Sequence, residues 1–316
     1  MSTKPVTSNQ SVNSREPEVL EVAEDCFAFY QPPGGWCVNN AGFIRSDDSV
    51  LVIDTVATAN RAVKLRAAVS DRTSRGLDTP ATIVTTHHHG DHHFGHSYFT
   101  NRTEVIAHSR AREEIIAAGL GMTKLFRGVD WGEIELTLPT ITFDDRLVVY
   151  VGDVKVELIH LGVAHTTNDI VAWVPSQRLL YSGDLVMSGG TPYCLMGSVR
   201  GSISVLHKLK ALNPAVVVPG HGPVGGVELI DDNLRYLTWL TEVAEYGYAH
   251  EIGSLTLAKS DRARYDLVRA DSERTVSNID RAYVELAGGE DGTPIDIGAS
   301  FMRMVELNGG PPSCFA

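Results

Sequence analysis

Short apolar runs separated by turn-forming residues make up the first ordered part of the chain. Residues 27–30, 36–44 and 50–53 are rich in β-branched and aromatic side chains. This pattern predicts strands that begin as an antiparallel arrangement. Helical spacing of apolar residues over 57–69, followed by an apolar run over 81–86, predicts a helix and a further strand.

The same alternation returns in the second half of the chain. Strands are predicted around 147–159 and over 169–174, 179–181 and 215–219, with a helix over 205–212. Two β-rich halves with outer helices predict an α/β protein built as a four-layer αββα sandwich.

Helical periodicity alone continues beyond about residue 228. No linker before this region is long or polar enough to make it independent, so we expect one domain over residues 18–316 that includes a helical C-terminal region. Residues 1–17 are polar and are predicted to form a disordered tail. The helices predicted in the C-terminal region cover 229–248, 255–268 and 276–286.

Composition excludes several classes of function. The chain has 27 Lys+Arg against 39 Asp+Glu, a formal charge of -12, and no basic run, so we expect no nucleic-acid partner. No segment approaches the roughly 20 apolar residues that cross a bilayer, and no secretory signal is visible, so a cytoplasmic protein is expected. Its four cysteines have no paired spacing and are expected to be free thiols: Cys26, Cys37, Cys194 and Cys314.

Half of the twelve histidines lie within ten positions directly after the strand predicted over 81–86. The run from His87 to His96 contains the pattern H-x-H-x-D-H, which places imidazoles and a carboxylate in one loop at a strand end. Zinc, iron and manganese accept such ligands. A solvated loop with adventitious metal affinity is the alternative interpretation.

Three distant segments favour a built metal site over that alternative. Each follows or ends a predicted strand, and together they supply the ligands that one loop cannot. Gly162 to Thr166 offers His165, Tyr181 to Asp184 offers a carboxylate, and Val218 to Gly222 offers His221.

These segments, in this order, resemble the metallo-β-lactamase superfamily, which includes glyoxalase II-type thioesterases. The resemblance spans about residues 19–222 and implies two divalent metal ions, with zinc expected first and iron or manganese as alternatives. It implies that Asp184 bridges both ions and that Asp91 also orients or exchanges the proton of a catalytic water. The remaining ligands implied are His87, His89 and His165 for one ion, and Asp91, His92 and His221 for the other.

The other histidines fall outside this pattern. For His88, His93, His96, His108, His160, His207 and His250 we expect a surface or supporting role rather than metal ligation. His88 alternates with two ligands and is expected to face away from them. Asp169 is expected either to support the site or to serve a turn.

Other stretches look like an actinobacterial branch of the superfamily, which includes the actinorhodin-type second-ring cyclases of aromatic polyketide biosynthesis. The stretches are 31–42, 188–199 and 308–316. This resemblance implies an apolar substrate pocket shaped by Trp36, Tyr193, Leu195 and Met196. The alternative is that these residues belong to hairpins, turns and core.

The function expected from these patterns is metal-dependent hydrolysis of an acyl thioester, coupled in the narrower resemblance to aldol ring closure of a polyketide. A lactonase or general small-thioester hydrolase, and a di-iron redox protein, are the enzyme alternatives. Antibiotic hydrolysis is disfavoured, because no cysteine belongs to the ligand set and no export signal is visible. The substrate is expected to be a small molecule or an acyl group on an acyl carrier protein. The oligomeric state stays open, with a homodimer as one option.

Overall fold

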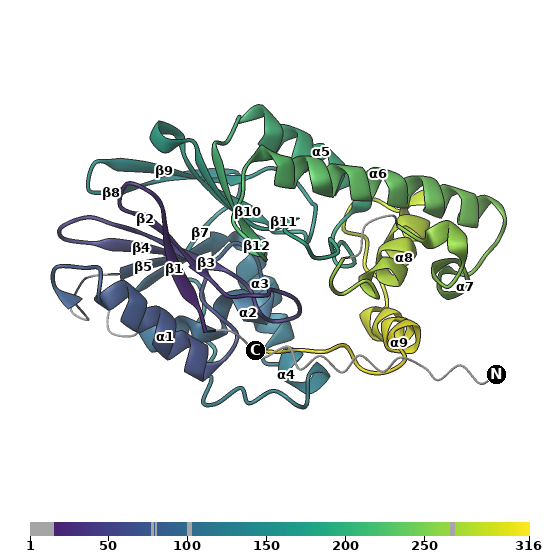
Figure 1. Cartoon of the computed structure of the whole chain (residues 1–316), viewed down its shortest axis with the longest axis horizontal. Helices are drawn as coiled ribbons and strands as arrows, with labels where there is room; N and C mark the ends of the chain where they lie inside the picture. The colour runs from purple at the N-terminus through teal and green to yellow at the C-terminus, as the bar shows by residue number, and fades with distance from the viewer. Residues whose placement is uncertain (1–15, 77–78, 80, 100–102, 266–268) are drawn as a thin grey trace, which may run out of the picture.

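The computed structural model describes residues 16–316 except 77–78, 80, 100–102 and 266–268. The tail predicted over 1–17 therefore lies almost wholly outside the described residues. Two β-sheets face each other, with helices on the outer surface of each, and a group of C-terminal helices lies beside them (Figure 1). The αββα sandwich predicted from the sequence is confirmed.

The first sheet has seven strands in chain order. The pairs from β1 to β4 are antiparallel, and the pairs from β4 to β7 are parallel. Its strands are β1 (Glu18–Ala23), β2 (Cys26–Tyr30), β3 (Ala41–Arg45), β4 (Val50–Ile53), β5 (Ala81–Val84), β6 (Glu104–His108) and β7 (Ile141–Phe143). The helices of this half are α1 (Ala59–Ser70), α2 (Gly90–His93), α3 (Ser109–Ala118), α4 (Met122–Leu125) and the 3-10 helix η2 (Phe94–Phe99).

The second sheet has five strands in the order β12-β11-β10-β9-β8. Helices α5 (Val199–Ala211) and α6 (Val227–Ala249) pack against β11, and the buried side chains of both helices join one apolar cluster with this sheet. The strands are β8 (Arg146–Val151), β9 (Val154–His160), β10 (Ile170–Val174), β11 (Leu179–Met187) and β12 (Val216–His221), and η3 (Pro175–Gln177) precedes β11.

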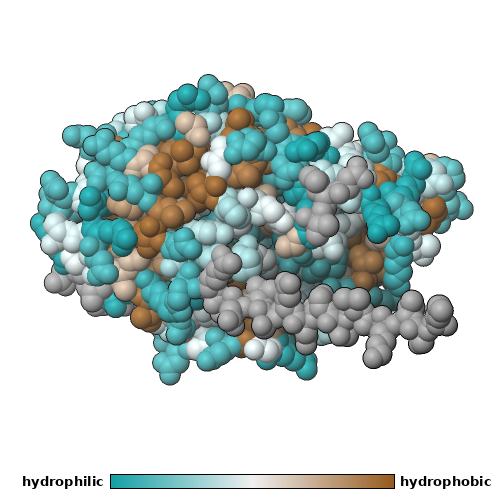
Figure 2. Space-filling view, in the orientation of Figure 1, coloured by the Kyte–Doolittle hydropathy of each residue, from teal (hydrophilic) through white to brown (hydrophobic). Residues whose placement is uncertain are grey.

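The two sheets meet through a shared core. Ile44 and Leu51 of the first sheet belong to the same buried cluster as Leu158 and Ile170 of the second. Figure 2 shows apolar residues reaching the surface over the strands on one face of the sandwich. No helix in the part of the chain that the structure describes is long and apolar enough to cross a membrane.

The structure differs from the sequence prediction in several elements. The strand predicted over 36–44 begins only at Ala41, because Gly34, Gly35 and Cys37 have positive φ and form a loop. In the region predicted as strand around 147–159, the structure has a hairpin of two strands, β8 and β9. Four elements were not predicted: β6, α3, α4 and β7. Instead of a helix over 255–268 there are only α7 (Ser254–Ala258) and η4 (Asp261–Ala263), with 266–268 outside the described residues.

The C-terminal helices are fixed to the sandwich by buried polar contacts. On α8 (Arg274–Leu286), Asn278 accepts a hydrogen bond from the Cys194 backbone N–H at 2.9 Å and donates to the Pro192 carbonyl at 2.7 Å. Arg281, the largest fully buried side chain, donates to the Leu195 carbonyl at 2.8 Å. These bonds hold residues 192–195 against α8. The helix α9 (Ile297–Asn308) packs on α8 and was not predicted.

The last residues return to the first half of the sandwich. Arg61 of α1 donates a hydrogen bond to the Phe315 carbonyl at 2.8 Å. Cys314 and Ala316 pack against the cluster of Cys37, Ala57 and Phe126. All four cysteines are free, as predicted.

We predict that Gly42→Ala destabilises the fold. An added Cβ at Gly42 would overlap the ring of Tyr181, whose hydroxyl bonds the Phe27 carbonyl between the two sheets. Such overpacking should lower the free energy of unfolding by about 1–3 kcal/mol in urea denaturation. Gly128→Ala, which adds a methyl group to open space, is the control and should change it by less than about 0.5 kcal/mol. Equal urea midpoints for the two variants would contradict the prediction and would show that the two sheets can move apart to accept the added methyl group.

Candidate metal centre

The structure brings all seven predicted ligands together at one end of the two sheets. His87 and His89 follow β5, and Asp91 and His92 lie on α2. His165 lies in the loop between β9 and β10, Asp184 lies in β11, and His221 ends β12. Their ligand atoms form two groups, each with all atoms within 4.8 Å of one another. One group is His87, His89, His165 and Asp184, and the other is Asp91, His92 and His221.

Asp184 reaches the centre because its strand is distorted. The pairing of β11 with β12 shifts register around Gly183, which has a positive φ of 52°. A side chain at Gly183 would press on Thr86 next to His87, so glycine is needed there for close approach as well as for conformation. The sequence placed this carboxylate at a strand end, whereas β11 continues to Met187.

The carboxylate of Asp184 lies between imidazoles of both groups. Its Oδ1 is 3.1 Å from Nε2 of His92, and its Oδ2 is 3.4 Å from Nε2 of His165. Nε2 of His221 is 3.4 Å from both Asp184 Oδ2 and Asp91 Oδ2. The geometry therefore joins the two groups through one side chain.

Several of these atoms are buried without a hydrogen-bond partner. Nε2 of His87, Nε2 of His92 and Oδ1 of Asp184 have none within the described residues, although buried polar atoms normally have one. Nitrogen and carboxylate donors that converge in this way fit divalent cations, since zinc, iron and manganese accept them. The donor set does not select among these metals.

Neighbouring groups hold the ligand rings by their second nitrogen. Asp54 Oδ2 lies 2.7 Å from Nδ1 of His92, and the Tyr193 carbonyl lies 2.5 Å from Nδ1 of His165. Thr86 donates its backbone N–H and its hydroxyl to Asp54 at 2.6 and 2.7 Å. These contacts fix each ring and leave Nε2 facing the centre.

Asp54 was not among the predicted site residues. It directly follows β4, with a positive φ of 58°, so its carboxylate emerges at the same sheet end as His87. The rule that found the ligands, a polar residue directly after a buried strand, could have found Asp54 as well.

The electrostatics of the centre separate neutral imidazoles from charged groups. Burial, reinforced by neighbouring imidazoles, lowers the pKa of His87 and His89 well below its ordinary value. Burial opposes ionisation of Asp184, but His221 and His92 overcome it and lower the pKa of Asp184 well below its ordinary value. The carboxylate is therefore ionised. Although burial opposes it, Asp184 and its neighbouring carboxylates raise the pKa of His92 well above its ordinary value and that of His221 to about 9, so these two rings carry protons while His87 and His89 are neutral. A cation bound here would displace the protons of His92 and His221.

The histidines outside the pattern do not join either group of ligand atoms. Three of them are nevertheless buried next to the centre: His88, which bonds Asn168, and His93 and His96. Burial lowers the pKa of His88 and of His96 to about 4, so these rings are neutral. His88, which was expected to face away from the ligands, lines the same cavity as His89. His108 packs on His160 with 4.4 Å between ring centroids, and His207 and His250 are exposed. Asp169 accepts hydrogen bonds from the Thr166 backbone and hydroxyl in the loop of His165.

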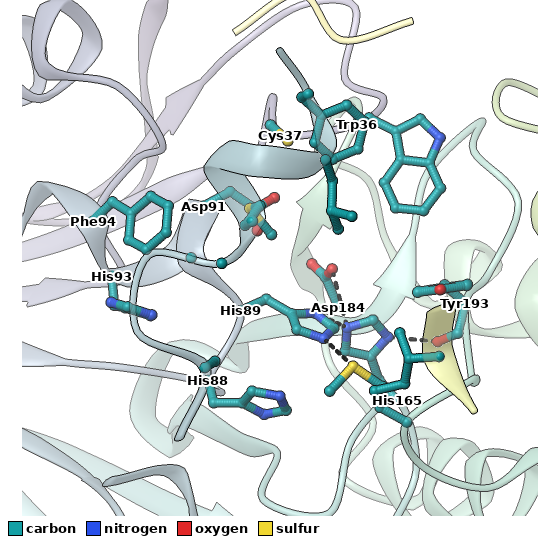
Figure 3. A pocket seen from close by; sticks show the side chains of 18 of the residues that line it. Trp36, Cys37, His88, His89, Asp91, His93, Phe94, His165, Asp184 and Tyr193 are labelled. Carbon is teal, nitrogen blue, oxygen red and sulfur yellow. Dashed lines mark hydrogen bonds and ion pairs between the residues drawn. The ribbon is translucent and has the colours of Figure 1, made fainter. Parts of the chain in front are cut away.

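A cavity of about 250 Å³ opens on the centre. Trp36, Tyr193 and Met196, predicted as pocket residues, line it together with Asp91, Asp184 and His165 (Figure 3). Leu195 does not line it. Its side chain is fully buried in a cluster with Val276 and Met304, and its carbonyl accepts hydrogen bonds from Arg281.

Further lining residues come from parts of the chain that sequence reasoning did not connect with the site. They are Met122, Leu125 and Phe126 around α4, and Arg274, Ile297 and Phe301 from α8 and α9. They carry no motif, and their distance along the chain hides their proximity. The wall they form is mostly apolar or aromatic, so the cavity favours a substrate with an apolar body.

Comparison with known proteins identifies the family of this arrangement. The family model described as "Metallo-beta-lactamase superfamily" matches residues 34–221, more than half of the chain. A metallo-beta-lactamase from Pontibacter korlensis has the same fold, with a TM-score of 0.57 and 19% identity over 71% of this chain and 99% of that one.

Curated relatives include proteins with different activities. A metallo-beta-lactamase type 2 of Bacteroides fragilis is 33% identical over 30% of this chain and 41% of its own length. The 2,4-dinitroanisole O-demethylase subunit alpha of a Nocardioides strain is 27% identical over 59% of this chain and 54% of its own. A probable hydroxyacylglutathione hydrolase of Schizosaccharomyces pombe is 23% identical over 67% of this chain and 75% of its own length. The chain thus spans about half the length of the first two.

We predict that Asp54→Asn weakens metal binding by the His92 group. An amide at this position can donate to Nδ1 of His92, which favours the tautomer with its proton on Nε2 and removes that ligand. Chelator competition should show about a 10- to 100-fold lower affinity for one of two ions, while the other ion is held as in the wild type. Far-UV circular dichroism is the control for folding and should be the same for the wild type and Asp54→Asn. Unchanged affinity for both ions would show that Asp54 does not set the tautomer.

Proposed function

Because the chain belongs to the metallo-beta-lactamase superfamily, we propose that it is a dinuclear metal-dependent hydrolase of acyl thioesters. The acyl group we propose is a flat, largely apolar one, of the kind found in aromatic polyketide intermediates. The observation that carries this proposal is the apolar cavity, which is lined by five of the seven converging residues: His89, Asp91, His165, Asp184 and His221.

The ligand set suits carbonyl chemistry. Two divalent cations held by these residues, zinc first among them, would supply Lewis acidity to a carbonyl oxygen and lower the pKa of water. In the chain itself, Asp91 lines the cavity with its Oδ2 3.4 Å from Nε2 of His221. Its carboxylate is placed to orient a water molecule and to accept or return a proton at Oδ2 during attack.

The residues of the cavity suit cleavage of the carbon–sulfur bond of a thioester. A thiolate is a good leaving group, so no strong general acid is required beside the scissile bond. Among the cavity residues, burial raises the pKa of Tyr193, so its phenol stays protonated and can donate a hydrogen bond without acting as a strong acid. The relative named as a hydroxyacylglutathione hydrolase supports a thioester substrate by analogy.

Ring closure by the same centre is the second activity that the cavity favours. A site that stabilises an oxyanion can also stabilise an enolate, and an aromatic wall can hold a folded acyl chain against it. The aromatic lining of Trp36, Phe126, Tyr193 and Phe301 supports this extension of the proposal. An acyl carrier protein as the donor of the acyl group follows from the family resemblance, and the charge of -12 gives no electrostatic support for it.

We predict metal-dependent thiol release from acyl thioesters. A panel of simple acyl and naphthoyl thioesters, followed with a thiol reagent, should show turnover that a chelator abolishes and added zinc restores. His87→Ala should lower kcat/KM by at least about a hundredfold, since it removes a ligand of one group. His207→Ala, at an exposed position of α5, is the matched control and should retain wild-type activity.

Other outcomes of the same panel decide between the alternatives. Opening of lactones without thiol release would replace the proposal with a lactonase. Formation of a cyclised product without free acid would indicate a cyclase that does not hydrolyse. Iron in the isolated protein with oxygen consumption would indicate a di-iron redox protein, and inert metal-loaded protein would contradict catalysis altogether.

A further inference from the structure

The outer wall of the cavity comes from chain that the family match does not cover. The match ends at residue 221, whereas Arg274 lies on α8 and Ile297 and Phe301 lie on α9. The metal ligands all lie within the matched range. Differences in substrate choice within the superfamily can therefore arise from these two helices while the centre stays the same.

Among the described residues, Arg274 is the one arginine or lysine that lines this cavity. Its side chain is only 2% exposed. Nη1 donates to the Met187 sulfur at 3.0 Å and to the Thr191 carbonyl at 3.1 Å, and Nη2 lies 3.0 Å from Asp271 Oδ2. Nε has no hydrogen-bond partner in the described part of the chain. A buried N–H donor without an acceptor is unfavourable, and a ligand oxygen would remove that penalty.

The guanidinium of Arg274 is set among aromatic rings. Its central carbon lies 4.0 Å from the ring centroid of Trp36 and 5.8 Å from that of Tyr193. Trp36 is fixed by a 2.6 Å hydrogen bond from its Nε1 to Glu273, the residue before Arg274. Its ring also packs on Tyr193 and Phe126 at 5.4 and 5.6 Å. This cage suits a flat conjugated group.

The charges around Arg274 indicate what kind of oxygen it accepts. Asp271 pairs with its guanidinium, and Glu273 accepts the Trp36 N–H, so two carboxylates from the residues just before α8 already belong to this cage. A further full negative charge would meet both of them. A carbonyl or hydroxyl oxygen, which accepts a hydrogen bond without bringing a net charge, fits better.

We infer that Arg274 is a specificity-determining residue, whose Nε–H binds a carbonyl or hydroxyl oxygen on a flat conjugated acyl group. This oxygen is separate from the scissile carbonyl, which belongs at the metal centre. The inference rests on the proposed function for its substrate class. A site built to bond such an oxygen discriminates strongly against the analogue that lacks it, because the donor is then left unpaired.

The test compares a set of hydroxynaphthoyl thioesters, which differ in the position of the hydroxyl group, with the naphthoyl thioester. Wild type should prefer at least one hydroxylated substrate by about tenfold or more in kcat/KM. Arg274→Lys keeps a cation beside Trp36 and Asp271 but lacks the Nε–H, so the ratio of kcat/KM for the hydroxylated over the naphthoyl substrate should fall to near one, whatever the change in absolute activity. Arg274→Met should behave in the same way.

Arg269→Met is the matched control. Arg269 is also buried, also pairs with an aspartate and also has an unpartnered Nε, but it does not line this cavity. Replacement of Arg269 should leave the preference for the hydroxylated substrate intact. Equal loss of activity on both kinds of substrate in Arg274→Lys would show that the residue only supports the structure, and the inference would fail.

Calorimetry separates this inference from the proposed function. Binding of hydroxynaphthoates and of naphthoate to the metal-loaded protein reports the preference even if no thioester is hydrolysed. Wild type should bind a hydroxynaphthoate about tenfold more tightly than naphthoate, and Arg274→Lys should bind both alike. No preference at any hydroxyl position in the wild type would overturn the inference, whatever the result of the hydrolysis assays.

Discussion

The burial of one carboxylate among imidazoles from both sheets is the constraint on which the rest of the site depends. Asp184 lies within 3.1 to 3.4 Å of ring nitrogens contributed by α2, by the loop before β10 and by β12. Burial keeps His87 and His89 neutral, while Asp184 keeps His92 and His221 protonated until a cation displaces those protons, so the state of the centre depends on side chains from both sheets. Both halves of the sandwich must therefore be correctly joined before any chemistry is available.

Much of the site could be predicted because its residues follow one local rule. Residues near the ends of predicted strands converge at one sheet end whatever their distance along the chain, so H-x-H-x-D-H, His165, Asp184 and His221 could be assembled from the sequence, although Asp184 in fact lies inside β11. The fold class followed from the same strand and helix periodicity. Asp54 obeys the rule too, but a single aspartate after a strand carries no pattern that separates it from a turn residue.

The rest of the site depends on tertiary contacts that the spacing of residues along the chain does not reveal. Leu195 lies between the cavity residues Tyr193 and Met196 in sequence, yet its side chain turns into the core because Arg281 holds its carbonyl. Cys37 and Cys314 lie far apart in the chain and still pack in one cluster. The helix α9 and its Phe301 reach the cavity only because α8 is fixed to residues 192–195 by buried polar bonds.

The return of the last residues to α1 has a practical meaning for work with this protein. Since the Phe315 carbonyl is held by Arg61, and Ala316 packs in the cluster behind Cys37, an affinity tag fused after Ala316 would have to leave from a packed position beside the cavity. Such a tag would compete with these contacts and could alter inhibitor screening or crystallisation by changing the cavity wall.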